Sequence, residues 1–475
     1  MITYERLGVE HPRCRRERCR VLRRPTGGYR EPGASRAELH SRRRGQKALS
    51  NSTDDGAADT RAGAGRGPRR QEDSEIAPLR LALASHQTEM HGDRAVSLIT
   101  MQAAQGSTAM VSTATMQAAV HEAPFRLSSV SRPVPGPGQA LVRIAASAVN
   151  PLDIKIRAGD AAHARHPLPA ILGLDLAGTI EATGQDVTRF GCGDEVYGMT
   201  GGIGGHQGSL AEFAAVDADL LALKPADITM REAAALPLIF ITAWEGLIDR
   251  ARLQAGQSVL VQGGSGGVGH MAIQIARAFG GTVFATGAPA RRSVIERFGA
   301  TFIDRSEPVA DYVIRLTNGC GFDIVYDTAG AATLDASFEA VSRFGHVVSS
   351  LGWGRHALAP LSFKGATYSG VFTLLPLLTG EGRVHHGDIL AQATRLVEAG
   401  EIVPLIDQRR FSLASVECAY NALRNGDAQG KIIVDLVTTC TATDTSGPTR
   451  AISAVPATRP VRRPLTQYHC FRRVT

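Results

Sequence analysis

The hydrophobic and polar positions follow two different patterns, and the change comes near residue 230. From residue 117 to about residue 235, short apolar or alternating runs stand between glycine- and proline-rich turns. They predict strands at 117–120, 140–147, 173–183 and 194–199. A series of short strands of this kind is typical of a small β-barrel.

Beyond residue 230, apolar strands alternate with amphipathic helices. Strands are predicted at 259–261, 282–286, 301–304, 323–327 and 346–351, and helices at 231–251 (a pair), 291–298, 309–317, 332–342 and 388–399, before a closing strand at 431–435. This alternation predicts a parallel, doubly wound sheet. The fold class is therefore α/β, with the parallel sheet inserted into the sequence of the β-rich domain. We expect the active site in the cleft between the two domains.

A glycine-rich turn joins the strand at 259–261 to the next helix. Gly264, Gly266 and Gly269 match G-x-G-x-x-G in this strand–turn–helix context. The first glycine permits a tight turn, the second lets the backbone approach a pyrophosphate, and the third lets the helix pack on the strand. The helix N-terminus offers free N–H groups to the phosphates. We therefore predict a dinucleotide site formed by Gly264, Ser265, Gly266, Gly267, Val268 and Gly269.

The next strand, at 282–286, indicates which dinucleotide binds. NAD sites usually place an acid after this strand to hold the ribose 2′-hydroxyl. No carboxylate lies between Gly264 and Glu296, and Arg291 and Arg292 follow the strand instead. Guanidinium groups suit a 2′-phosphate, so the sequence predicts NADPH rather than NADH. The alternative is that both arginines belong to a solvated helix start.

The two ends of the chain differ in charge from its middle. Residues 1–115 contain 20 Lys and Arg against 13 Asp and Glu, and residues 437–475 contain 6 against 1. Residues 116–436 contain 26 against 31, so the positive net charge belongs to the ends. Without sustained apolar periodicity, both ends are predicted to be disordered. Residues 1–109 are interpreted as an artefact of start-site choice, with the true start at Met110 or Met116.

Two other interpretations of the N-terminal segment are weaker. A nucleic-acid-binding arm would need aromatic side chains to stack on bases, and this segment offers only Tyr4 and Tyr29, so a nucleic-acid partner is not expected. A mitochondrial transit peptide avoids acids, whereas Glu5, Glu10 and Glu17 interrupt the arginine clusters.

Cysteine usage and hydropathy bear on the compartment. Cys192, Cys320 and Cys418 lie far apart in the central part of the sequence, which argues against a disulfide framework. No apolar run approaches the roughly 20 residues that a membrane span needs. We therefore expect a cytoplasmic protein with no membrane partner.

Four motifs of the central part point to one family. They are NPLDIKIRAG at 150–159, GLDLAG at 173–178, GDEVYG at 193–198 and the glycine-rich segment 256–277. With them, residues 116–436 resemble the medium-chain dehydrogenase/reductase superfamily, and within it the zinc-independent quinone oxidoreductases related to zeta-crystallin. The resemblance implies a GroES-like catalytic domain at 116–238 and 365–436, a Rossmann domain at 239–364, and tails at 1–115 and 437–475.

The same resemblance implies that no metal is bound. Zinc-dependent relatives carry a cysteine where this chain has Asn150 and a histidine where it has Leu174, and an amide with an aliphatic side chain cannot make a zinc site. Their lobe of four cysteines is absent from this sequence. His163, His166 and His206 lack a second ligand at a recognised zinc-finger spacing, so they are interpreted as solvated.

The resemblance also implies roles for single residues. Asn150 and Asp153 would line the reacting pocket, with Asn150 contacting the nicotinamide ribose or a substrate oxygen. Lys155 stands where many quinone reductases have a tyrosine, so the proton donor stays open, and a cofactor contact is its alternative role. Thr242 would lie near the nicotinamide, and Arg291 and Arg305 near the adenosine. Arg292 is also expected among the cofactor contacts. The simpler interpretations are a helix cap for Asp153 and surface charges for Lys155 and Arg305.

These inferences predict NADPH-dependent hydride transfer to a quinone or an α,β-unsaturated carbonyl compound. Preorganised donors stabilise the oxyanion that develops, so no metal is required. Apolar walls are expected from Phe240, Trp244, Trp353 and Phe372. Two alternatives stay open, an enoyl-thioester reductase and a non-catalytic NADPH-binding protein. The resemblance further suggests a homodimer through the edge of the nucleotide-domain sheet.

Overall fold

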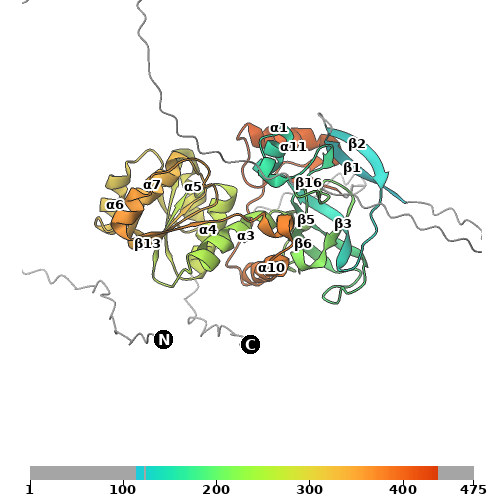
Figure 1. The fold of residues 1–475 in the computed structure, drawn as a ribbon, viewed down its shortest axis with the longest axis horizontal. Coiled ribbons are helices and arrows are strands. Elements are labelled where there is room, and N and C mark those ends of the chain that lie inside the picture. Colours follow the sequence, from blue (N-terminus) through green and yellow to red (C-terminus); the bar gives the residue numbers. More distant parts are fainter. Residues whose placement is uncertain (1–113, 122–124, 437–475) are drawn as a thin grey trace, which may run out of the picture. The chain divides into compact units, whose positions relative to one another are not determined.

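The structure is a computed structural model that describes residues 114–121 and 125–436 (Figure 1). The disorder predicted for residues 1–115 and 437–475, and the interpretation of the N-terminal segment, concern residues outside this part, except at residues 114 and 115, where the prediction is wrong at Thr115, the first residue of a strand. Within it the chain is α/β, as the sequence predicts, with two largely antiparallel sheets and one parallel sheet.

The β-rich domain is built on two sheets. Its strands are β1 (Thr115–His121), β2 (Phe125–Ser131), β3 (Gln139–Ala148), β4 (Ala170–Ile171), β5 (Asp175–Thr183), β6 (Glu195–Met199), β7 (Phe213–Asp217), β8 (Leu221–Leu223), β15 (Phe411–Ser412) and β16 (Ile433–Asp435). The larger sheet has the order β15-β16-β3-β5-β6-β8, with β7 also paired to β3, and the smaller has the order β2-β1-β4. Gly178 permits the close pairing of β5 with β3, because a Cβ there would lie 2.2 Å from the Arg143 carbonyl oxygen.

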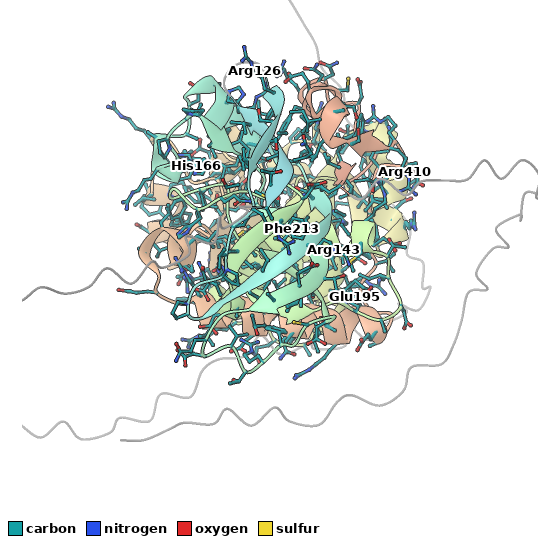
Figure 2. The ribbon with its side chains drawn as sticks, turned by 90° about the vertical axis from the view of Figure 1, so that its right-hand side faces the viewer. Arg126, Arg143, His166, Glu195, Phe213 and Arg410 are labelled. Carbon is teal, nitrogen blue, oxygen red and sulfur yellow. The ribbon has the colours of Figure 1, made fainter. Side chains whose placement is uncertain are left out.

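One side of β3 and β7 carries a cluster of polar and aromatic side chains. Arg143 and Phe213 are register partners on these strands, and Figure 2 labels both on the side that faces the viewer. The Arg132 guanidinium lies 3.9 Å above the Phe213 ring, and Arg143 lies 3.3 Å from Glu181. This side of the sheet therefore consists of cation–π and ionic contacts, while the opposite side packs into the core.

The nucleotide domain contains a six-stranded, fully parallel sheet. Its strands are β9 (Ser258–Gln262), β10 (Thr282–Gly287), β11 (Thr301–Asp304), β12 (Phe322–Asp327), β13 (Val341–Ser349) and β14 (Thr367–Gly370), in the order β11-β10-β9-β12-β13-β14. The first strand, β9, is apolar throughout its centre because helices cover both faces. The strand order reverses between β9 and β12, and this switch point is where α/β sheets bind ligands. The sheet extends to β14, beyond the limit at residue 364 expected for this domain.

The helices of the described residues mostly follow the predicted amphipathic segments. They are α1 (Pro151–Ala158), α2 (Met230–Ala234), α3 (Pro237–Trp244), α4 (Gly267–Ala278), α5 (Arg292–Arg297), α6 (Val309–Thr317), α7 (Ala332–Ala340), α8 (Ala359–Lys364), α9 (Leu375–Thr379), α10 (Arg383–Glu398) and α11 (Val416–Arg424). In Figure 1, α5, α6 and α7 lie around the parallel sheet. None of the helices found in the described segments is long and apolar enough to cross a membrane.

Two predicted helix boundaries are wrong. Helix α10 begins at Arg383 rather than at residue 388. Gly387 lies inside the helix, where the lack of a side chain permits close packing, since a Cβ there would lie 2.4 Å from the Asp219 carbonyl oxygen. Helix α7 ends at Ala340 rather than at residue 342, because Val341 already belongs to strand β13. After α3 the chain continues as a π-helical segment, Glu245–Arg250.

The end of the described chain returns to its beginning. Strand β16 pairs antiparallel with β3, with Ile433 opposite Ala148. Residues just before β16 therefore lie beside residues just after β3, although more than half of the described chain separates them in sequence. This pairing creates one wall of the candidate site.

Candidate functional site

A cavity of about 690 Å³ opens at the switch point of the parallel sheet. Its lining comes from the turn after β9, from the segment after β3, from α3, from the segments after β13 and β14, and from residues 423–432. The β-rich and nucleotide domains both contribute, as expected for an active-site cleft. The charged side chains that line it in the described part of the chain are Lys155, Arg291 and Lys431, and no carboxylate lines it there.

The glycine turn fits a dinucleotide pyrophosphate. A Cβ at Gly264 would lie 2.6 Å from the Ala285 Cβ, and a Cβ at Gly269 would lie 2.1 Å from the Gly263 carbonyl oxygen. Both positions therefore need glycine for packing. Gly266 caps α4 without a side chain, so the N–H groups of the first turn stay open to a ligand. Ser265, Gly266, Gly267 and Val268 all line the cavity.

One detail of this turn differs from the prediction. The left-handed conformation falls on Gly263, with φ +78°, rather than on Gly264. The Gly263 N–H donates to the Thr286 hydroxyl at 3.1 Å, and that hydroxyl donates to Gln262 Oε1 at 2.8 Å. Hydrogen bonds from the neighbouring strand β10 thus hold the turn in shape. Neither Gly263 nor Thr286 could be selected from the motif alone.

Arg291 is the arginine that reaches the cavity. Its guanidinium donates to Gln429 Oε1 at 2.6 Å and to the Ala428 carbonyl oxygen at 3.0 Å. These bonds link the end of β10 to the segment before β16, and they leave part of the five-donor guanidinium available to a ligand.

Arg292 and Arg305 lie elsewhere. Arg292 is 61% exposed, stacks over the Phe302 ring at 4.4 Å and lies 3.5 Å from Glu296. Arg305 is exposed after β11, where its backbone N–H donates to the Gly287 carbonyl oxygen. Neither side chain belongs to the cavity lining of the described chain.

Asn150, Asp175 and Lys431 form a closed, buried network on one wall. Asn150 Nδ2 donates to Asp175 Oδ2 at 2.9 Å and to the Ala148 carbonyl oxygen at 3.3 Å. Lys431 Nζ donates to Asn150 Oδ1 and lies 3.3 Å from Asp175 Oδ2. The other oxygen of Asp175 accepts the Leu238 N–H at 2.8 Å and so caps the start of α3. The amide of Asn150 is therefore engaged on every side within the protein.

Asp153 does not line the cavity as predicted. It is fully buried on α1, and its Oδ2 accepts the Asn150 N–H at 2.8 Å, so it caps the helix. Burial raises the pKa of Asp153 to about 7. Its Oδ1 and the hydroxyl of Tyr420 are both buried without a hydrogen-bond partner among the described residues. The helix-cap interpretation is the one that this geometry favours.

Lys155 lines the cavity from α1. It is exposed, and it has no hydrogen bond or ion pair within the described chain. The His163 ring also lines the cavity, 5.2 Å from the Trp353 ring and 6.1 Å from the Phe372 ring. The lining of the described chain thus contains a cation without a protein partner and an aromatic cluster. Phe240 and Trp244 belong to the core instead.

Thr242 lines the cavity from α3. Its hydroxyl donates to the Leu238 carbonyl oxygen at 2.6 Å and lies 3.0 Å from the hydroxyl of Thr373, which also lines the cavity. The two hydroxyl groups form a small polar patch in an otherwise apolar region formed by the α3 and β14 segments.

Comparison with known proteins assigns the fold to a family. Residues 136–226 match the alcohol dehydrogenase GroES-like domain, and residues 298–434 match the zinc-binding dehydrogenase domain. The chain is 35% identical over 316 residues to a 2-methylene-furan-3-one reductase of Solanum lycopersicum, which covers 65% of this chain and 74% of that protein. It is 33% identical over 305 residues to the chloroplastic NADPH-dependent alkenal/one oxidoreductase of Arabidopsis thaliana, covering 62% and 72% of the two chains.

A solved structure agrees over the same region. An alcohol dehydrogenase superfamily protein from Novosphingobium aromaticivorans superposes with a TM-score of 0.67 and 57% identity, covering 68% of this chain and all of that one. The chain belongs to the medium-chain dehydrogenase/reductase superfamily.

Two further matches cover a similar share of this chain. The phthioceranic/hydroxyphthioceranic acid synthases of Mycobacterium are 33% identical over 325 residues, although the chain spans 15% of their length. The enoyl reductase CurK, at 24% identity and a TM-score of 0.61, shares the fold.

The zinc site known from some medium-chain dehydrogenases does not fit this chain. At the two ligand positions the structure has Asn150, whose amide is engaged by neighbours, and Leu174, which is completely buried. The described segments contain no group of three or more His, Cys, Asp or Glu side chains able to hold a metal. His166 accepts the Gly205 N–H, and His206 lies 3.2 Å from Arg383. No reaction step is therefore derived through a metal.

Proposed function

We propose that this medium-chain reductase transfers hydride from NADPH to a quinone or an α,β-unsaturated carbonyl compound without a metal. The observation that carries the proposal is the charge of the cavity: Lys155 and Arg291 line it without an ion pair in the described chain, and no carboxylate of the described chain lines it. Such a cavity favours a polyanionic dinucleotide. When bound, the reduced nicotinamide supplies the hydride.

The glycine turn and Arg291 are assigned to the cofactor. The open N–H groups of α4 would bind the pyrophosphate, and the free part of the Arg291 guanidinium would bind the 2′-phosphate. No carboxylate follows β10 in the sequence before Glu296, which supports NADPH over NADH. Asp304 of β11, the register partner of Gly287, accepts hydrogen bonds from Ser306. Thr242 is assigned to the nicotinamide end. Arg292 and Arg305 are exposed and lie outside the cavity lining, so we assign them only a long-range electrostatic attraction of the cofactor.

Lys155 is assigned to the acceptor. Its unpaired ammonium would donate a hydrogen bond to the carbonyl oxygen as negative charge develops there. The Trp353 and Phe372 rings offer a flat apolar surface to a conjugated acceptor. Because the amide of Asn150 is engaged, we assign it to positioning the wall, through Lys431 and Asp175, rather than to contacting substrate.

An enoyl-thioester reductase is the second candidate. The matching segments of the Mycobacterium synthases support it, and the fold of CurK is compatible with it. A lysine rather than a tyrosine at position 155 weighs against it, as expected from the sequence.

The proposal extends to assembly and compartment. A homodimer would pair the edge strand β14 of the parallel sheet with its counterpart in a second copy. A cytoplasmic location is consistent with Cys192, Cys320 and Cys418, which are free thiols.

The deciding experiment follows NADPH or NADH absorbance with the purified protein and three acceptors: a naphthoquinone, a small enone and a crotonyl thioester. Oxidation of NADPH with the quinone or enone is expected. Turnover of the thioester and of neither other acceptor would instead identify the protein as an enoyl-thioester reductase. Tight NADPH binding without turnover would indicate a non-catalytic binding protein.

A matched pair of variants tests the cofactor assignment. Arg291→Ala should weaken NADPH binding by roughly tenfold to a hundredfold, the value of a charge-assisted hydrogen bond. NADH binding should change little, because NADH lacks the 2′-phosphate. Arg292→Ala, at an exposed position, is the control. Equal losses for NADPH and NADH in Arg291→Ala would reject the assignment.

A further inference from the structure

A buried acid–histidine pair lies behind the cavity wall. Glu245 opens the π-helical segment after α3, and His386 lies on α10. Their residues are 8% and 1% exposed, and His386 Nε2 lies 3.2 Å from Glu245 Oε1. The other nitrogen of His386, Nδ1, is buried without a partner in the described part of the chain.

Thr373 connects this pair to the cavity. It follows β14, lines the cavity and is 5% exposed. Its hydroxyl lies 2.9 Å from Glu245 Oε2. Because the Thr242 hydroxyl gives its own proton to the Leu238 carbonyl oxygen, its oxygen is left as an acceptor. The Thr373 hydroxyl therefore has two acceptors inside the protein, Thr242 Oγ1 at 3.0 Å and Glu245 Oε2 at 2.9 Å. A continuous path therefore runs from the cavity through Thr373 and Glu245 to His386.

Other charged groups near the pair are few. Tyr326 of β12 donates to the Thr242 carbonyl oxygen at 2.6 Å, and burial, followed by the charge of Glu245, raises its pKa, so it stays protonated. His385 of α10 and Asp249 of the π-helical segment pair with each other at 2.8 Å near the surface. Within the described segments, no Lys or Arg forms an ion pair with Glu245. Among the described residues, His386 is therefore the basic side chain in contact with Glu245.

We propose that Glu245 and His386 store the proton that completes reduction of an α,β-unsaturated carbonyl compound, and that Thr373 delivers it. This inference rests on the proposed function. Hydride addition to the β-carbon leaves an enolate. The Thr373 O–H bond breaks as a C–H bond forms at the α-carbon, and the Thr373 oxygen takes a proton from Glu245. Glu245 takes one from the His386 imidazolium, and water later reprotonates the imidazole. Atoms and charge therefore balance, the enolate electron pair forms the new C–H bond, and no oxidation state changes in this step.

The test uses an enone with an α-methyl group, reduced in D₂O with rapid quenching. The wild-type protein should give one configuration at the α-carbon. Thr373→Val removes the hydroxyl at nearly constant shape, so it should give both configurations and slow enone turnover by roughly a hundredfold, the usual contribution of a general acid. Quinone turnover should fall less, because its product anion takes a proton on oxygen from water. Thr379→Val, outside the cavity lining, is the control and should resemble wild type.

Glu245→Gln separates proton storage from support of the wall. It keeps a hydrogen-bonding group for Thr373 and His386 but cannot donate a carboxyl proton. It should remove an ionisation from the pH profile of enone kcat while leaving the Kd of NADPH unchanged. If Thr373→Val reduces the enone at the wild-type rate and gives one configuration at the α-carbon, the inference about proton delivery is wrong and the proposed function stands. A wild-type protein that reduces no acceptor would overturn the proposed function, and the inference with it.

Discussion

Two lysines line the same cavity in opposite situations. Lys431 is 8% exposed, and Asn150, Asp175 and the Val149 carbonyl oxygen surround its ammonium. Lys155 is exposed on α1 and has no partner in the described chain. One ammonium is consumed by the protein, and the other is available to a ligand.

This difference explains why the two lysines have different tasks. A buried charge is tolerated where its partners are fixed, because desolvation is offset only by good geometry. An exposed ammonium keeps its hydration until an acceptor replaces the water, and it can therefore respond to charge that develops in a reaction. The Lys431 wall should govern stability, and Lys155 should govern turnover.

The largest effect is expected from Lys431→Met, which leaves the Asp175 carboxylate buried and unpaired. Removing one partner of a buried ion pair costs about 3–5 kcal/mol. Urea unfolding at pH 7 should show a loss of that size in the free energy of unfolding. Lys155→Met is the matched control, and it should change this free energy by less than about 0.5 kcal/mol.

The pH dependence of that loss provides a check on its cause. Burial already raises the pKa of Asp175, and Lys431 opposes this shift. Without Lys431 the folded state takes up a proton more readily than the unfolded state, so the loss should shrink as the pH falls. A loss that stays constant with pH would point to packing rather than to charge.

The next largest effect is expected from Lys155→Met on catalysis. Loss of a donor to a developing oxyanion lowers kcat by roughly 10²-fold. The Kd of NADPH should stay unchanged, and Lys155→Arg should restore part of the rate. Steady-state kinetics with an enone, together with fluorescence titration of NADPH, would measure both quantities. A parallel loss of NADPH affinity would favour the cofactor role that the sequence left open for Lys155.

The sequence predicts those parts of the site that short segments define. The turn at Gly264, Gly266 and Gly269 is recognisable because strand, turn and helix follow one another directly. The same holds for most strands of the parallel sheet. The φ of Gly263 escapes prediction, since it depends on the Thr286 hydroxyl from the neighbouring strand.

The Lys431 wall escapes prediction for a related reason. Lys431 and Asn150 are 281 residues apart, and they meet because β16 pairs with β3. A weak signal exists in the sequence: a lysine begins the apolar run 431–434, and Asp175 stands within the apolar run 174–177. A charge entering a buried strand requires a partner, but a single sequence does not say which one.

The smallest effect concerns Asp153, which lies beneath the Lys431 wall. Its pKa is about 7 in the folded protein, chiefly through burial, against about 3.9 in an unfolded chain. The folded state therefore binds more protons between these two values. Stability from this group is fully present below the unfolded pKa and is lost as the pH rises through about 7.

Asp153→Asn removes this titration while it keeps an oxygen that can accept the Asn150 N–H. The free energy of unfolding should be measured for both proteins at pH 5 and pH 8. The free energy of unfolding of the wild type minus that of the variant should be more positive at pH 5 than at pH 8. At pH 5 the carboxyl is protonated and tolerated in the core, whereas at pH 8 a buried carboxylate is costly. The reverse order would mean that the carboxylate is the favoured form, held by Asn150 and the nearby Lys431 charge. In that case Asp153 would belong to the closed ionic network rather than stand beside it as a helix cap.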